Sequence, residues 1–460
     1  MMKNFRPIPT VMLAVLVCPL NIALAAGGTA KPNIILILAD DLGYECIGAN
    51  GGQTYKTPEL DKMAQRGMRF EHCYAQPLCT PSRVQIMTGI YNVRNYVTFG
   101  LLEQSQTTFA HLLKKAGYVT CMAGKWQLGG EGPRMCERAR HFGFDESYLC
   151  SWYSYYWNPT VVINGTAKDY RQEDYGPDVV NDLACRFLEL NKARPFFLYY
   201  TMSLPHDPFL PTPDSRVREP WRFGDNPEKK GPKGTPDMFK KGDPKYFGHM
   251  VAYMDKNVGR LLARLDELGL RDNTLVLFTG DNGSPVGEAL LHDRKVRAGK
   301  GNMTDAGTHV PLVVCWPAGI RQPGVSTDLV DFSDFLPTLC DAAGAEVPAE
   351  LKVDGRSFLP HLRGEPGPPR PWCYCWYTKY PVNEAPQEWA RTQRYKLYRT
   401  GQFYDMRDDA LEEHPLISLC PEAQAARTLL VQALDRYRDG RPAPWAAKEK
   451  QSRTEKGVAP

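Results

Sequence analysis

Four apolar, β-branched stretches are separated along the chain by helical or loop sequence. They are Asn33–Ala39, Tyr118–Ala123, Phe196–Met202 and Thr274–Thr279. Stretches that are apolar at successive positions, rather than at every second one, are typical of parallel strands covered on both faces. The pattern predicts an α/β fold in which helices sandwich a large, mixed, mostly parallel sheet.

A short segment with polar residues follows each predicted strand at its carboxyl end. The four segments are Asp40 and Asp41, Gly124 to Gln127, Ser203 to His206, and Gly280 to Gly283. In open α/β sheets ligands bind beyond the carboxyl ends of the strands, so the four groups are expected to meet at one edge of the sheet.

Four of these residues offer only oxygen ligands: Asp40, Asp41, Asp281 and Asn282. Oxygen ligands favour a hard ion, calcium first and magnesium second. Asp-Asp after a strand and Asp-Asn-Gly are also common turn sequences, so each pair alone is more simply structural. Their joint position after strands favours a metal site.

The segment Cys79-Thr80-Pro81-Ser82-Arg83 is expected to begin a helix, because Pro81 suits the first helical turn. The amino end of a helix favours an anion, and Arg83 one turn later could bind the same anion. On this segment alone, a buried structural cysteine and a nucleophile are equally supported.

The carboxyl-terminal part changes in pattern after an expected helix at Phe332 to Ala343. We predict a large domain at 26–346 and a smaller α+β domain at 347–441. The smaller domain is expected to carry an antiparallel sheet between Trp372 and Met406 and a helix from Glu422 to Arg438. Residues 442–460 form a polar tail that is expected to be disordered.

The first residues read as an export signal. Lys3 and Arg6 precede an apolar stretch from Val11 to Leu24, and Ala23-Leu24-Ala25 suits cleavage, so residues 1–25 are a predicted signal peptide. No later segment is long and apolar enough to span a membrane. A secreted or periplasmic protein of bacterial origin, without stable membrane insertion, is expected.

Composition adds two limits. A net charge of +4 among 460 residues gives no reason to expect a nucleic-acid partner. Thirteen cysteines in an exported chain permit disulfides. Without Cys18 and Cys79 an odd number is left, so at least one thiol is expected to stay free or to pair between chains.

Taken together, the motifs resemble those of the formylglycine-dependent sulfatases in the alkaline phosphatase superfamily. The similar stretches are Pro32 to Gly43, Cys79 to Gly89, Gly124 to Gly129, Pro205-His206, Thr279 to Gly283, Gly299 to Pro311, Asp354 to Phe358, and Tyr395 to Met406. They occur in the family's order, and Cys-x-Pro-x-Arg is the most specific of them.

The resemblance implies that a maturation enzyme oxidises Cys79 to formylglycine, whose hydrated form is a geminal diol. One hydroxyl would attack sulfur to give a sulfo-enzyme intermediate, and the other would expel sulfate. Asp40, Asp41, Asp281 and Asn282 match the family's calcium ligands, with the modified Cys79 beside them.

The resemblance also assigns roles to four cationic side chains. Arg83 would hold the formylglycine and the metal-site carboxylates, and Lys125 and Lys300 would contact the sulfate oxygens. His206 matches the histidine near the leaving oxygen, where it would act as a general acid.

Three residues depart from the family pattern. Gln127 stands where the family usually has the histidine that takes a proton from the diol, and a neutral amide is no base. Asp305 and His309 replace a common glutamate and arginine. We still expect an active sulfatase. The alternatives are a phosphate mono- or diesterase of the same superfamily, and an inactive glycan-binding relative.

The substrate is the least determined feature. Cys150 to Trp157 is rich in aromatic residues that could stack on sugar rings or simply pack on the body, and Pro211 to Lys245 resembles a long loop near His206. A carbohydrate sulfate cut from a chain end is favoured over a simple aryl sulfate.

Overall fold

The computed structural model describes residues 31–150, 156–171, 173–215 and 242–455. The predicted signal peptide, the centre of the aromatic segment at 151–155 and most of the loop between Pro211 and Lys245 lie outside these residues. None of the helices within the described ranges is long and apolar enough to cross a membrane.

A ten-stranded mixed sheet forms the centre of the fold, in the order β12-β2-β11-β8-β1-β7-β3-β4-β5-β6. Its strands are β1 (Asn33–Ala39), β2 (Met68–Tyr74), β3 (Val119–Lys125), β4 (Glu146–Cys150), β5 (Thr160–Ile163), β6 (Thr166–Asp169), β7 (Phe196–Thr201), β8 (Thr274–Gly280), β11 (Leu312–Cys315) and β12 (Gly324–Asp331). The four predicted strands are β1, β3, β7 and β8, and they are parallel neighbours at its centre. The predicted sheet is thereby confirmed.

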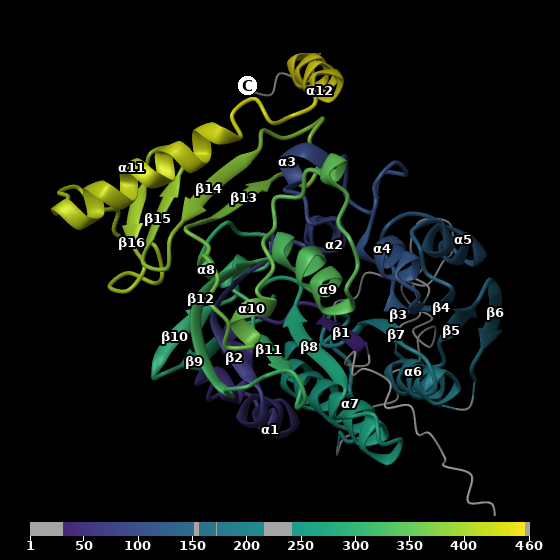
Figure 1. Cartoon of the computed structure of the whole chain (residues 1–460). Coiled ribbons are helices and arrows are strands. Elements are labelled where there is room, and N and C mark those ends of the chain that lie inside the picture. Colours follow the sequence, from purple (N-terminus) through teal and green to yellow (C-terminus); the bar gives the residue numbers. More distant parts are fainter. Residues whose placement is uncertain (1–30, 151–155, 172, 216–241, 456–460) are drawn as a thin grey trace, which may run out of the picture. The chain divides into compact units, whose positions relative to one another are not determined.

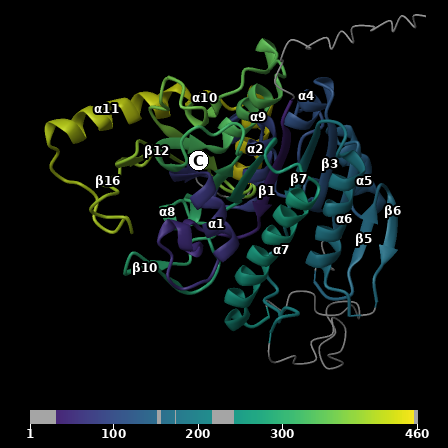
Figure 2. The same cartoon turned by 60° about the horizontal axis from the view of Figure 1, so that its bottom comes forward.

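Helices cover both faces of this sheet (Figure 1). One face carries α1 (Pro58–Arg66), α6 (Gly176–Asn191) and α7 (Phe247–Glu267), which come forward in Figure 2. The other carries α2 (Cys79–Thr88), α4 (Phe109–Lys115), α5 (Pro133–His141) and α9 (Phe335–Ala343).

Strand β1 explains why both faces need a cover. Ile34, Leu36 and Leu38 pack into the core under α2, α4 and α9, whereas Ile35 and Ile37 pack into the core under α1, α6 and α7. Successive side chains of a strand point to opposite faces, so a strand that is apolar at every position must be buried twice.

The shorter elements connect these layers. They are α3 (Asn92–Asn95), α8 (Asp305–Thr308), α10 (Leu359–Leu362) and the antiparallel hairpin β9 (Glu288–Leu291) with β10 (Arg294–Arg297).

A second, antiparallel sheet follows in the carboxyl-terminal part. It consists of β13 (Cys373–Tyr377), β14 (Gln387–Arg391), β15 (Tyr395–Tyr398) and β16 (Phe403–Asp405). Helix α11 (Pro421–Arg436) lies along this sheet (Figure 1). Both the sheet and the helix were predicted from the sequence.

The expectation of a disordered tail is wrong for most of its length. Helix α12 (Ala443–Glu455) occupies it. Arg441 pairs with Glu449 at 2.5 Å, and its guanidinium lies 4.8 Å from the centre of the Trp376 ring and 4.9 Å from that of Trp445. One arginine thus ties this polar helix to β13.

All twelve cysteines in the described ranges are free thiols, and all but Cys185 and Cys420 are buried. The disulfides that export would permit are therefore not formed among these residues. The buried thiols other than Cys79 behave as small apolar side chains of the core.

Candidate active site

Two carboxylates leave the sheet side by side because β1 and β8 are parallel and in register. Ala39 pairs with Gly280, so Asp40 and Asp281 come next on adjacent strands. Both are fully buried. The backbone N–H of Asp41 donates to Asp281 Oδ1 at 2.9 Å, and Asn282 Nδ2 donates to Asp41 Oδ1 at 2.8 Å. The carboxyl ends of β1 and β8 thus form one acidic cluster, as predicted.

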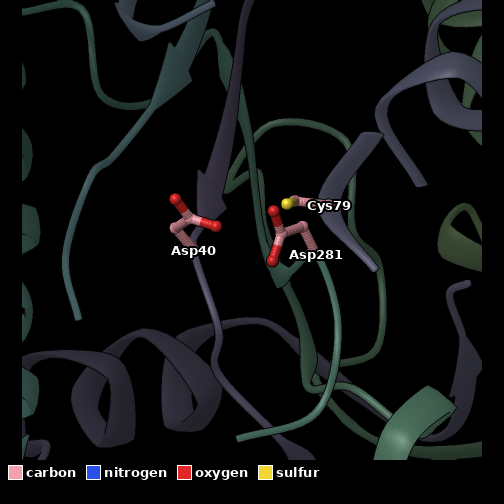
Figure 3. Close-up of side chains that lie close together, drawn as sticks. All are labelled: Asp40, Cys79 and Asp281. Carbon is pink, nitrogen blue, oxygen red and sulfur yellow. The ribbon is translucent and has the colours of Figure 1, made fainter. Parts of the chain in front are cut away.

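Cys79 is the first residue of α2, and its side chain turns toward Asp40 and Asp281 (Figure 3). Ligand atoms of these three residues lie within 4.8 Å of one another. Burial, only partly offset by Lys125, raises the pKa of the Cys79 thiol. The unmodified side chain is therefore a protonated thiol at neutral pH, and a poor nucleophile.

Arg83 lies one turn further along α2 and is fully buried. Its Nη2 is 2.9 Å from Asp281 Oδ2 and 3.7 Å from Asp40 Oδ1, and its Nη1 donates to the carbonyl oxygen of Lys125 at 3.2 Å. One guanidinium therefore joins the ends of β1, β3 and β8 to the helix that carries Cys79.

Two lysines reach the same cluster from elsewhere in the chain. Lys125, the last residue of β3, pairs with Asp40, and Lys300 Nζ lies 2.5 Å from Asp41 Oδ2. The cluster thus contains three carboxyl groups, on Asp40, Asp41 and Asp281, and three basic side chains, those of Arg83, Lys125 and Lys300. A divalent cation bound here would give the site a net positive charge and would release lysines for an anionic ligand.

The two central aspartates differ in their pKa. Burial alone would raise the pKa of Asp40, but Lys125, His206, Arg83 and Lys300 outweigh it and hold the pKa well below its usual range. Burial and the neighbouring charge of Asp40 raise the pKa of Asp281 to about 7. An added cation would favour the ionised form of both.

The oxygen atoms fit a metal ion. Asp40 Oδ1 and Asn282 Oδ1 are buried and accept no hydrogen bond. Buried oxygens without a donor are costly, and a cation satisfies them. With the other carboxylate oxygens of the cluster they make the oxygen-rich ligand set that hard cations prefer.

His206 lies in the loop after β7, beside the acidic cluster. Its Nε2 is 3.7 Å from Asp41 Oδ2. Its Nδ1 is 2.6 Å from the carbonyl oxygen of Asp207 and 2.9 Å from Asp207 Oδ1. Both neighbours of Nδ1 are acceptors, so Nδ1 carries a proton and Nε2 is the atom that can gain or lose one.

Gln127 follows Lys125 by two residues and is only 9% exposed. Its backbone is left-handed, with a φ of 49°, and neither amide atom has a hydrogen-bond partner. The structure thus brings Cys79, Arg83, Lys125, His206 and Lys300 around the carboxylates, and places Gln127 just beyond them.

Three further residues hold the site but were given no role from the sequence, although Lys396 lies in the similar stretch Tyr395 to Met406. Asp207 fixes the protonation of His206. Arg391 binds Asp305 Oδ1 and Oδ2, both at 2.6 Å, and Lys396 lies 3.2 Å from Asp305 Oδ1. Asp207 could have been found from the sequence, because it is an acidic residue directly after a candidate histidine. Nothing near Arg391 or Lys396 in the sequence indicates that either binds Asp305.

The two other departures from the family pattern are well accommodated. Asp305 is one residue through which the small sheet holds the loop after Lys300, and the Met303 carbonyl oxygen, which accepts from Lys396 and Tyr398, is another. The His309 ring stacks between Tyr44, at a centroid distance of 4.0 Å, and Tyr74, at 5.0 Å. Its Nε2 lies 2.8 Å from the Glu71 carbonyl oxygen.

Known proteins are similar to this chain over most of its length. The chain is 28% identical to the N-acetylglucosamine-6-O-sulfatase of Bacteroides thetaiotaomicron, covering 90% of this chain and 88% of the relative. It is 32% identical to arylsulfatase A of Bos taurus, over 82% and 77%. The fold matches a solved protein in complex with its substrate D-glucosamine-2-N,6-O-disulfate, with a TM-score of 0.70 and 26% identity, over 89% of this chain and 98% of that one.

Family models account for nearly the whole described chain. Residues 297–439 match the model described as N-sulphoglucosamine sulphohydrolase, C-terminal. Residues 32–345 match the sulfatase model. The chain therefore belongs to the sulfatase family, and it is a sulfuric ester hydrolase.

Proposed function

We propose that this protein is an exported hydrolase that removes sulfate from a carbohydrate, using calcium and a formylglycine made from Cys79 by a maturation enzyme. One observation carries the proposal: the Cys79 side chain lies at the start of a helix against Asp40 and Asp281, with Arg83 buried between them. A buried thiol with a raised pKa suits a residue that is modified before use better than a free nucleophile.

A metal ion and the modified Cys79 side chain would supply the chemistry at the sulfur atom. A calcium ion held by Asp40, Asp41, Asp281, Asn282 and the modified Cys79 would supply Lewis-acid chemistry. The diol of formylglycine would supply the attacking hydroxyl.

Arg83 keeps the carboxylates and the modified side chain in place. Lys125 and Lys300, which pair with Asp40 and Asp41, bind sulfate oxygens and offset the charge of the transition state.

His206 protonates the leaving oxygen. Asp207 holds the Nδ1 proton, so the imidazolium delivers its Nε2 proton. A sugar alkoxide needs that proton because it is a strong base and a poor leaving group.

The sugar class is supported by the relatives. Two sulfatases of similar sequence are named for N-acetylglucosamine 6-sulfate and N-acetylgalactosamine 6-sulfate. We therefore propose an amino-sugar sulfate as substrate. Sulfate release from the 6-sulfates of these two sugars by the matured protein tests the proposal, and release from neither would contradict the sugar class.

The chemistry itself is tested by mass. The peptide containing Cys79, taken from protein produced with a maturation enzyme, is expected about 18 Da below the thiol form, as the chemistry of formylglycine formation requires. An unmodified peptide under these conditions would favour the glycan-binding alternative. Comparing the rates at which the matured protein hydrolyses a sulfate ester and the phosphate ester of the same alcohol distinguishes a sulfatase from a phosphate esterase.

Calcium is expected to raise the melting temperature of chelator-treated protein, because an ion that binds only the folded state stabilises it by about 2.7 kcal/mol at one hundred times its Kd. Asp40→Asn removes one carboxylate. It should raise the calcium concentration needed for half of this rise in melting temperature at least tenfold. Asp255→Asn is the matched control, since Asp255 is also buried but binds backbone N–H groups of Glu59 and Leu60. An unchanged response in Asp40→Asn would contradict the assignment.

His206→Gln is expected to lower kcat for a sugar sulfate by about 10²–10⁴-fold, the range of general acid catalysis. The loss for 4-nitrophenyl sulfate should be much smaller, because nitrophenolate leaves without protonation. His249→Gln is the control, since His249 contacts Ser215 outside the site. Equal losses for both substrates would show that His206 positions the substrate instead of donating a proton.

A further inference from the structure

A cavity of about 860 Å³ lies beside the candidate active site, within the size range of small-molecule sites. Phe99 and Gly100 form one wall, α5 forms another, and Gln127 lines it as well. The Gly100 N–H donates to Thr80 Oγ1 at 3.1 Å, so this wall is tied to the residue that follows Cys79. One wall of the cavity is therefore anchored to the first turn of α2, and Gln127 in its lining follows Lys125 of the candidate site by two residues.

The Gln127 side chain in this cavity has an amide group that a ligand could hydrogen-bond. It is nine-tenths buried, yet its amide oxygen and nitrogen both lack hydrogen-bond partners. Leaving two buried polar atoms unpaired destabilises a fold, and native proteins rarely do so without a reason. The left-handed backbone at this residue, with a φ of 49°, is a second local cost of the kind that collects at binding sites.

The chemistry of the cavity favours a sugar. A carboxamide offers one acceptor and one donor side by side, which matches a pair of sugar hydroxyls or an N-acetyl group. Phe99 lines the cavity, and an aromatic side chain can pack against the C–H surface of a sugar ring. Arg134 and Glu137 of α5 add polar groups to the lining.

We propose that this cavity binds the sugar part of the sulfate ester, and that Gln127 is a specificity-determining residue that hydrogen-bonds a hydroxyl or acetamido group of that sugar. The proposal rests on the proposed function. It also gives the amide at position 127 a role that needs no basicity: recognition of the substrate in place of proton removal.

The test measures binding without turnover. The Cys79→Ala protein is titrated calorimetrically with N-acetylglucosamine 6-sulfate and N-acetylgalactosamine 6-sulfate, with and without Gln127→Leu. Loss of two hydrogen bonds is expected to weaken binding of the better sugar about tenfold. Gln127→His, which carries the family's residue, is a second variant with the same expected direction. Gln393→Leu is the matched control, because the Gln393 amide donates to Thr327 outside the cavity.

Inorganic sulfate is the second probe, and it should bind equally well with and without Gln127→Leu because it has no sugar to contact. Equal sugar affinity in the two proteins would overturn the proposal. So would an equal loss for sulfate and sugar, which would place Gln127 at the reacting groups, and so would failure of both sugars to bind. Sulfate release from 4-nitrophenyl sulfate by the matured protein reports separately on the proposed function, which stands if that release persists.

Discussion

Cys79→Ala is expected to lower kcat/KM for any sulfate ester by about 10⁴-fold or more, because it removes the group that attacks sulfur. The fold should survive, since the substitution shortens one buried side chain and leaves Arg83 with both of its aspartates. Steady-state sulfate release, with a melting curve on the same sample, checks both statements.

Cys79→Ser separates a simple nucleophile from one that needs a second hydroxyl. A serine could attack sulfur once, but its sulfate ester has no neighbouring hydroxyl to expel the product. At most one equivalent of the alcohol is expected, with sulfate retained on the protein at position 79. Sustained turnover by Cys79→Ser whose peptide mass shows an unoxidised serine, or more than 1% of the parent activity in Cys79→Ala, would rule out the formylglycine mechanism.

The central strands could be predicted because their signal is local. Asn33–Ala39 and Thr274–Thr279 are apolar at nearly every position, and burial on both faces is the simplest way to remove such a strand from water. Parallel pairing then places Asp40 beside Asp281 without further information. The positions of the proposed metal ligands Asp40 and Asp281 follow from the same geometry.

What the sequence does not contain is which distant groups pair. Nothing near Lys125 indicates that it binds Asp40, 85 positions away, and nothing near Asp305 indicates Arg391 or Lys396 in the small sheet. The helix at Ala443–Glu455 was missed for the same reason: its composition is polar, and the contacts of Arg441 with Trp376 and Glu449 are tertiary. Gln127 was noticed only as a missing base, because an unpartnered amide in a cavity is visible only in three dimensions.

Arg83→Met is expected to have the largest effect on stability. The guanidinium is fully buried and pairs with Asp281 at 2.9 Å, and removing one partner of a buried ion pair typically costs about 3–5 kcal/mol. Activity should fall with it, since Arg83 also joins the start of α2 to the end of β3 through the Lys125 carbonyl. Denaturant unfolding of metal-free protein measures the first effect and sulfate release the second.

The loss of unfolding free energy in Arg83→Met should depend on pH, because Asp281 titrates. The native pKa of Asp281, about 7, is above its unfolded value, so the native state holds a proton that the unfolded state releases. Its contribution to the free energy of unfolding therefore falls as pH rises from about 4 to 7. Without Arg83 the native pKa rises further, and a protonated carboxyl needs no cation.

Arg83→Met should consequently lower the free energy of unfolding less at pH 5.5 than at pH 8. Calcium at pH 8 should recover part of this loss, because it supplies positive charge to the same carboxylates. Arg391→Met is the matched control: Arg391 is also fully buried and paired, but with Asp305. Arg391→Met should destabilise the protein, but calcium at pH 8 should stabilise this variant no more than it stabilises the parent protein. A penalty for Arg83→Met that is the same at both pH values would mean that Asp281 is not the carboxylate Arg83 neutralises.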